Sequence, residues 1–119
     1  MTWLHAVVDV PEHLHPAAAA FWASALGWPL GPPWPGHQEL RSFEPPGGSA
    51  YLHLQRVDAP ARVHVDVESE LPDETVSHAL AAGATLVGAQ DRWRTLRSPG
   101  GLPFCVLGAA ERQEPEAST

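Results

Sequence analysis

Apolar and polar positions alternate along several short segments of the chain, and each such segment predicts a β-strand. Two other segments, residues 16–26 and 72–82, have the apolar stripe of a helix. Each of these helices opens with a proline and is followed by a glycine, which are favoured first and stop residues. The predicted strands are residues 3–10, 28–31, 38–43, 50–57, 62–67, 84–88, 91–96 and 102–107.

The order of one strand, one helix and three strands occurs twice, and the opening proline and the stop glycine have the same separation in both helices. This repeat predicts an α+β domain of two tandem βαβββ modules, at about residues 1–58 and 59–108, followed by a polar tail over residues 109–119. The alternative is an α+β domain with two unrelated strand–helix units.

Composition narrows the classes of function. Apolar residues make up 44% of the chain, which is enough for one globular core. The net charge is −7 and there is no lysine, so we expect no nucleic-acid partner, no Schiff base and no Walker-type phosphate loop. No apolar run reaches the roughly 20 residues that span a bilayer. The single cysteine and the absence of a signal-peptide pattern predict a cytoplasmic protein.

Six short motifs follow one another along the chain. They are FWASALGW at 21–28, LQRV at 54–57, RVHVDV at 62–67, AGAT at 82–85, SPGG at 98–101 and FCVL at 104–107. In this order they resemble glyoxalase-like and bleomycin-resistance-like proteins of the vicinal-oxygen-chelate (VOC) superfamily. The resemblance covers roughly residues 3–108. It implies that the two modules curl into a cupped half-barrel sheet, with helices on the outer face and a small-molecule ligand in the cup. It also implies a homodimer.

The same resemblance implies a divalent metal, Zn, Ni, Fe or Mn, bound by the first and last strands of each module. The matching positions are His5, His53, His64 and Cys105. Gln55 replaces His53 if the register slips by two residues. Metal-dependent relatives typically carry Glu where this chain has Cys105, and a thiolate favours Zn over Mg or Mn. Asp66 lies on the face of His64 and is the candidate catalytic base or partner of the ligands.

A pocket without metal is the alternative, because seven histidines in 119 residues place some on strand faces by chance. The predicted pocket residues are Trp34, Tyr51, Gln55, Trp93 and Arg97. Indole rings stack on planar or cationic ligands. The prolines at 32, 33 and 35 predict an irregular loop that acts as a lid. Phe21 and Trp22 are expected in the core.

The sequence therefore predicts a small-molecule-binding glyoxalase-like protein. One reading is a metal-dependent lyase, isomerase or dioxygenase-type enzyme that acts on a small oxygenated metabolite. Another is a metal-free protein that sequesters a ligand, as antibiotic-resistance proteins do. A third is a structural or regulatory dimer with no chemistry in the cup. The fold alone does not choose between them, because function depends on the site.

Overall fold

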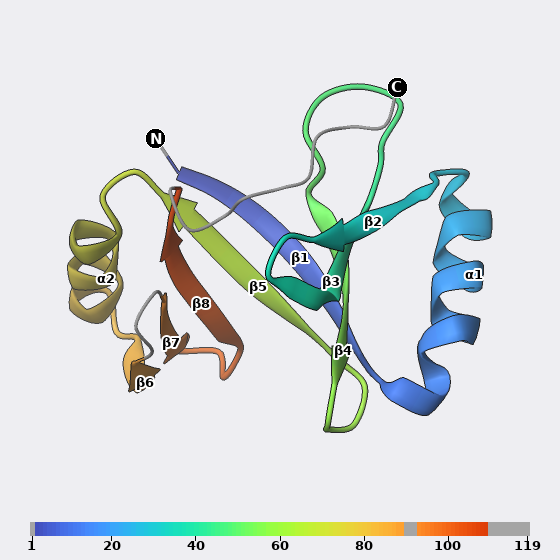
Figure 1. The fold of residues 1–119 in the computed structure, drawn as a ribbon. Helices are drawn as coiled ribbons and strands as arrows, with labels where there is room; N and C mark the ends of the chain where they lie inside the picture. The colour runs from blue at the N-terminus through green and yellow to red at the C-terminus, as the bar shows by residue number, and fades with distance from the viewer. Residues whose placement is uncertain (1, 90–92, 110–119) are drawn as a thin grey trace. The chain divides into compact units, whose positions relative to one another are not determined.

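The computed structural model describes residues 2–89 and 93–109, which form two modules of the same order (Figure 1). The first contains β1 (Thr2–Pro11), the short 3-10 helix η1 (Glu12–Leu14), α1 (His15–Leu26), β2 (Leu30–Trp34), β3 (His37–Phe43) and β4 (Leu52–Val57). The second contains β5 (Arg62–Ser69), α2 (Pro72–Ala81), β6 (Thr85–Ala89), β7 (Trp93–Arg97) and β8 (Pro103–Gly108). The predicted α+β class and the repeated βαβββ order are confirmed. The first two residues of the strand predicted at 91–96, and the predicted tail beyond residue 109, lie outside the described residues.

The described chain divides into two compact units. The α1 unit comprises residues 6–63, and the α2 unit comprises residues 2–5, 64–89 and 93–109. The strands have the order β2-β3-β4-β1 in the α1 unit and β5-β8-β7-β6 in the α2 unit. Neither helix of the described residues is both long and apolar enough to cross a membrane.

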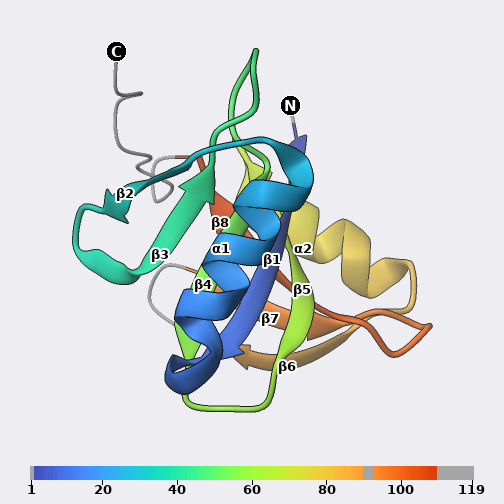
Figure 2. The same ribbon diagram turned by 90° about the vertical axis from the view of Figure 1, so that its right-hand side faces the viewer.

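In the α1 unit, β1 runs parallel to β4, and β3 pairs with β4 in antiparallel orientation. One face of these strands carries a core of Val8, Val10, Phe43 and Leu54. A stripe of α1 packs on this core through Ala18, Ala19, Trp22 and Ala23. Figure 2 shows α1 lying across these strands. The helix therefore covers one face of the strands, and the side chains of the other face are left for other contacts.

Helix α1 follows the predicted pattern except at Phe21. The helix has Pro16 in its first turn and ends at Gly27, whose positive φ of 70° suits glycine. Trp22 packs against the core as expected. The prediction for Phe21 is wrong, because its side chain is 60% exposed and contacts Trp22 edge-on. Adjacent residues on a helix point about 100° apart, so only one of the two rings can lie in the stripe.

The prediction of an irregular loop in the Pro-rich segment is also wrong. This segment forms strand β2 rather than an irregular loop, and Pro32 and Pro33 lie within that strand. Within the part of the chain that the structure describes, β2 pairs with β3 alone, and its register with β3 is irregular. Proline is tolerated on such an edge strand because the missing N–H can face away from the partner. The predicted lid is therefore a strand of the sheet.

In the α2 unit, β5 runs parallel to β8, and β7 pairs with both β8 and β6 in antiparallel orientation. Helix α2, beside β8 in Figure 1, begins at Pro72 and carries Asp73 and Glu74 in its first turn. These acidic side chains complement the positive end of the helix dipole. Ser69 lies just before the helix, where its hydroxyl accepts the N–H of Leu71.

Candidate metal centre

Three potential metal ligands meet on one face of the α2 unit. The parallel pairing of β5 and β8 places Asp66 opposite Cys105, and His64 is two residues before Asp66 on the same face of β5. One ligand atom of each residue lies within 4.8 Å of the other two. His64 Nε2 lies 3.2 Å from Asp66 Oδ1, and both side chains are mostly buried. The structure thus brings together two of the predicted metal ligands and the predicted catalytic carboxylate.

A divalent ion fits the chemistry of these three donors. Imidazole nitrogen, carboxylate oxygen and thiolate sulfur all bind transition metals, and tetrahedral ligand atoms lie about 3.3–3.8 Å apart at normal bond lengths. The ligand atoms lie within 4.8 Å of one another, so binding an ion would draw the more distant atoms closer together. Asp66 has a second carboxylate oxygen that can bind an ion while the first contacts His64.

His5 lies in the same unit and contacts a carboxylate that the sequence analysis did not identify. Its Nε2 atom is 3.0 Å from Glu68 Oε1, and the His5 side chain is only 6% exposed. A carboxylate that accepts one ring N–H leaves the other ring nitrogen with a lone pair, which is the usual arrangement of a metal-binding histidine. His5 is therefore chemically suited to binding a metal through Nδ1.

Residues of β7 extend the face that carries Cys105. Thr95 pairs with Cys105, and its hydroxyl lies 3.5 Å from Cys105 Sγ. Trp93 is two residues away from Thr95, so its indole ring projects to the same face, where it is 37% exposed. Arg97 also belongs to this face, but its guanidinium donates to the carbonyl of Gly101 in the following turn. Trp93 is thus the predicted pocket residue that can best reach a ligand beside Cys105.

The remaining predicted ligand, His53, belongs to the α1 unit. It is fully buried, and its Nδ1 atom lies 2.7 Å from the hydroxyl of Ser42. The same hydroxyl accepts a hydrogen bond from the indole N–H of Trp34 at 2.8 Å. The Trp34 ring also packs edge-on against His53, with 5.4 Å between the ring centroids. Trp34 was predicted in a loop that lines the pocket, but it is a buried residue at the end of β2.

The other predicted pocket residues of the α1 unit lie in different surroundings. Gln55 pairs with Asp9 in the parallel β1–β4 ladder and is half-buried. Asp9 is fully buried and accepts a hydrogen bond from Arg62 Nε at 3.2 Å. Tyr51 precedes β4, is 51% exposed and contacts the ring of Trp28 edge-on.

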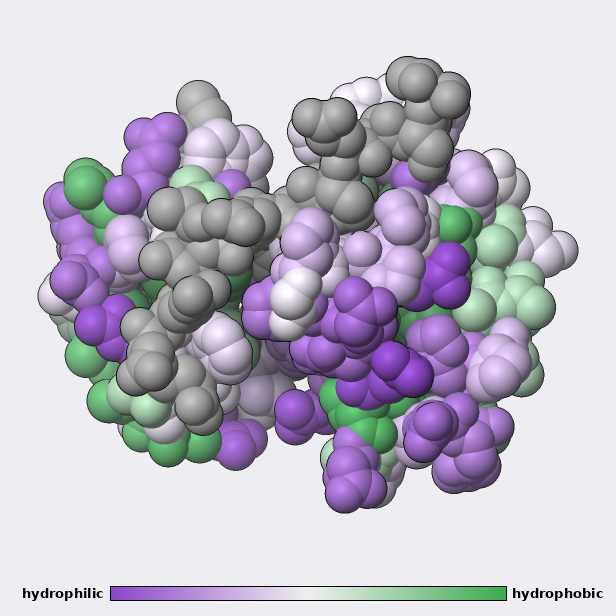
Figure 3. All heavy atoms as spheres, in the orientation of Figure 1, coloured by the Kyte–Doolittle hydropathy of each residue, from purple (hydrophilic) through white to green (hydrophobic). Residues whose placement is uncertain are grey.

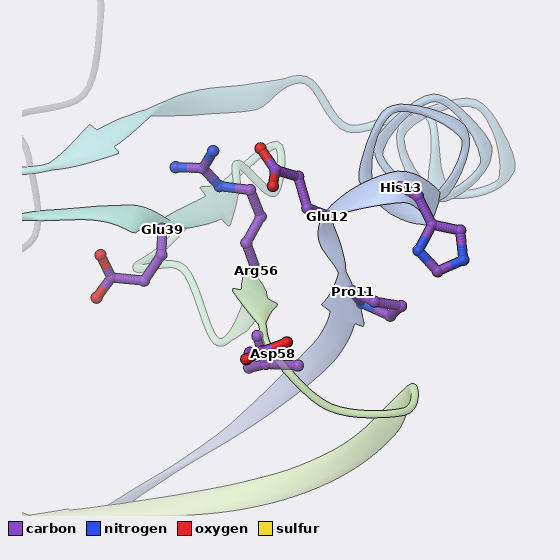
Figure 4. Close-up of a pocket in the computed structure, with 7 residues that line it drawn as sticks. Pro11, Glu12, His13, Glu39, Arg56 and Asp58 are labelled. Carbon is purple, nitrogen blue, oxygen red and sulfur yellow. The ribbon is translucent and has the colours of Figure 1, made fainter.

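The α1 unit has a separate cavity of about 680 Å³ at the C-terminal ends of β1 and β4 (Figure 4). It is lined by Pro11, Glu12, His13, Glu39, Arg56, Val57 and Asp58. This lining is mainly charged, whereas small-molecule sites are mostly apolar with a few polar groups. None of the predicted site residues lines this cavity, so we place the candidate site at the strand face of the α2 unit.

His15, at the start of α1, has a shifted pKa that bears on pH dependence. Burial of its ring lowers the pKa below the ordinary value of 6.5, and the nearby positive charges of Arg56 and Arg41 lower it further. Its Nε2 atom is buried and has no hydrogen-bond partner among the described residues. His15 is therefore a neutral residue of the α1 unit at pH 7.

Glu68 and Ser42 were not predicted from the sequence. Glu68 follows His64 and Asp66 at every second position, so strand alternation would have placed it on the same face. It was overlooked because the predicted strand ended at residue 67, whereas β5 continues to Ser69. Ser42 had no such signal, because its contact with His53 depends on the register of β3 against β4.

Comparison with known proteins agrees with the geometry. Two βαβββ modules are the architecture of the VOC superfamily, and the family model of the glyoxalase-like domain matches residues 5–107. The chain therefore belongs to the glyoxalase-like domain family. A solved structure, the Mn(II)-bound glyoxalase from Novosphingobium aromaticivorans, has the same fold with a TM-score of 0.60 at 18% identity. The match covers 97% of this chain and 41% of that glyoxalase, so this chain spans well under half of its length. A search of curated proteins gives no significant match.

Proposed function

We propose that this chain is a divalent-metal-dependent enzyme of the glyoxalase-like family that acts on a small oxygenated metabolite. The observation that supports this proposal is the cluster of His64, Asp66 and Cys105, whose ligand atoms lie within 4.8 Å of one another on two paired strands. The Mn(II) ion in the glyoxalase of the same fold adds support, because it shows that this fold can hold a divalent ion. A lyase or isomerase is the reaction class that we favour.

The donor set favours some metals over others. Imidazole suits Zn, Ni and Fe, and a carboxylate suits Mn, whereas a thiolate selects softer ions. Cys105 therefore makes Zn the preferred ion among the four candidates, with Ni and Fe next. A thiolate ligand must remain reduced, which agrees with the predicted cytoplasmic location.

The side chains of the α2 unit have separate roles in this proposal. A bound ion would polarise the oxygen atoms of a small-molecule substrate or lower the pKa of a bound water. His64, Asp66 and Cys105 would hold that ion, and Glu68 holds the ring of His5 in the same unit. Trp93 provides an apolar ring for a planar ligand. Because one carboxylate oxygen of Asp66 contacts His64, its second oxygen would serve either as a ligand of the ion or as the proton acceptor.

Spectroscopy of the cobalt-loaded or cadmium-loaded protein tests the metal centre directly. We expect near-stoichiometric binding and a sulfur-to-metal charge-transfer band that disappears in Cys105→Ser. His64→Gln should lower the affinity, whereas His78→Gln, at an exposed position of α2, should not. Elemental analysis of untagged protein should find Zn, Ni, Fe or Mn. The proposal is wrong if neither ion binds and reconstituted protein contains no metal.

A metal-free binding protein is the second candidate. It is supported by the 37% exposure of Trp93 on the face of Cys105 and by the replacement of the usual Glu by Cys105. In that case quenching of Trp93 fluorescence by planar, antibiotic-like ligands would be independent of added metal and of chelator. Trp93→Phe would serve as the control that assigns the signal.

The predicted homodimer is part of the proposal. Several large apolar side chains of the α2 unit are exposed, namely Leu71, Leu80, Leu86, Val87 and Leu102. Figure 3 shows apolar surface in the region where Figure 1 places β6, an edge strand. A second copy could cover this surface. Light scattering should give twice the chain mass of 12.8 kDa, and Val87→Lys should shift the protein toward the monomer.

A further inference from the structure

Trp34, Ser42 and His53 form a buried chain of hydrogen bonds. The direction in which each bond is donated determines which ring nitrogen of His53 carries the proton. The indole nitrogen of Trp34 can only donate, so the hydroxyl of Ser42 accepts at 2.8 Å. The Ser42 hydroxyl lies 2.7 Å from Nδ1 of His53, and either atom could be the donor in that contact. The donor assignment decides which nitrogen of His53 carries the proton.

Only one of the two assignments satisfies the hydroxyl of Ser42. If Ser42 donates to Nδ1 of His53, its single hydrogen has an acceptor and Nδ1 uses its lone pair. If instead His53 donates from Nδ1, the hydroxyl hydrogen of Ser42 has no acceptor among the described residues. Ser42 is 5% exposed, and leaving a buried polar group unsatisfied costs about 1–3 kcal/mol. The first assignment therefore dominates.

We infer that His53 is held as the neutral tautomer with its proton on Nε2, with Ser42 and Trp34 as its positioning residues. The edge-on contact with the Trp34 ring fixes the plane of the imidazole as well. In this state His53 offers an N–H through Nε2 and no lone pair. Nε2 of His53 therefore donates to an oxygen acceptor, such as a carbonyl or a carboxylate, and does not bind a metal ion. This differs from the sequence expectation that His53 is a metal ligand, and it does not depend on the proposed metal centre.

Nitrogen NMR of the histidine rings tests the tautomer in the full chain. In ¹⁵N-labelled protein at neutral pH, we expect the two-bond correlation pattern of a neutral ring protonated at Nε2, assigned to His53 by its absence in His53→Gln. Ser42→Ala should produce a mixture of tautomers, and Ser42→Thr should restore the single one because it keeps the hydroxyl. A wild-type spectrum with the proton on Nδ1, or with an imidazolium ring, overturns the inference.

Zinc titration of the same samples separates the two proposals. Signals of His64 should shift, whereas Nε2 of His53 should stay protonated. The Zn affinity of His53→Gln should fall by less than the roughly tenfold loss that even outer-shell substitutions cause. Loss of the Nε2 proton of His53 on adding Zn would overturn the inference. If no Zn binds, the metal proposal fails while the tautomer of His53 is still decided by the metal-free spectrum.

Discussion

At the scale of single residues, Glu68 is the carboxylate most directly coupled to a candidate ligand. Its Oε1 atom lies 3.0 Å from His5 Nε2, and both side chains are largely buried. Glu68→Gln removes the negative charge that holds the His5 ring, so we expect the Zn affinity to fall about tenfold or more. Competition with a chromophoric chelator measures this change. Glu74→Gln, at an exposed position of α2, is the matched control. Equal affinities for wild type and Glu68→Gln would mean that the pair serves only the fold.

Leu54 is the residue on which the core of the α1 unit depends most clearly. It is fully buried, and it packs with Val8, Val10 and Phe43 under helix α1. Leu54→Ala removes buried methyl groups and leaves a cavity, so the free energy of unfolding should fall by about 2–5 kcal/mol. Leu14→Ala, where the side chain is 45% exposed and lies outside the proposed dimer surface, should cost much less. Urea denaturation of both variants measures the difference, and equal losses would contradict the assigned core.

Strand alternation was sufficient to find the residues that share a face, but not those that touch. It placed His64 and Asp66 together. Cys105 was grouped with His64 only through the family resemblance, and the pairing of β5 with β8 places it opposite Asp66. The contact of Ser42 with His53 depends on register between strands, which a single sequence does not contain. The periodicity within one strand therefore predicts which side chains share a face of the sheet, whereas the pairing between strands determines which side chains are in contact.

At the scale of elements, the start of α2 offers a test of local capping. Ser69 is 3% exposed, and its hydroxyl accepts the N–H of Leu71 and lies 2.8 Å from the hydroxyl of Thr75. Ser69→Ala leaves a backbone donor at the helix start without this acceptor. We expect a loss of about 1–2 kcal/mol in the free energy of unfolding. Ser77→Ala, on the exposed side of α2, should be nearly neutral in the same urea titration.

The start of α1 links stability to pH through His15. Its pKa is lowered in the folded protein by burial and by Arg56 and Arg41, so the unfolded chain binds more protons between the folded pKa and 6.5. The free energy of unfolding should therefore decrease as the pH falls below 6.5 and be fully restored above it. His15→Gln should weaken this dependence, as urea titrations at about pH 5 and 7.5 would show. An unchanged dependence would mean that other groups cause it.

Elements were predicted best where local chemistry and packing agree. Both helices begin and end close to their proline and glycine signals, because those residues act through their own backbone. Strand β2 was predicted as a loop because two adjacent prolines oppose a strand in the interior of a sheet. Its edge position removes that conflict, and only the strand order reveals the edge.

At the scale of the whole molecule, the repeat of the βαβββ module was readable because each copy carries the same local signals in the same order. The position of a candidate site within that repeat was not readable to the same degree. The sequence predicted four metal ligands as one set. Three of them, His5, His64 and Cys105, belong to the α2 unit, whereas His53 belongs to the α1 unit. The chemistry that is complete within one unit is that of His64, Asp66 and Cys105.

The candidate metal centre joins β5 to β8, so metal binding should stabilise the folded state of the α2 unit in particular. A ligand that binds only the folded state adds about 2.7 kcal/mol at a concentration of 100 times its Kd. Hydrogen exchange with and without Zn should therefore slow at amides of β5 and β8 that exchange by local opening, and much less in β3. In Cys105→Ser the slowing should be lost. Protection confined to β3 and β4 would place the ion elsewhere in the chain. If Zn binds tightly and no amide is protected, Zn binds without ordering the strands that carry its ligands.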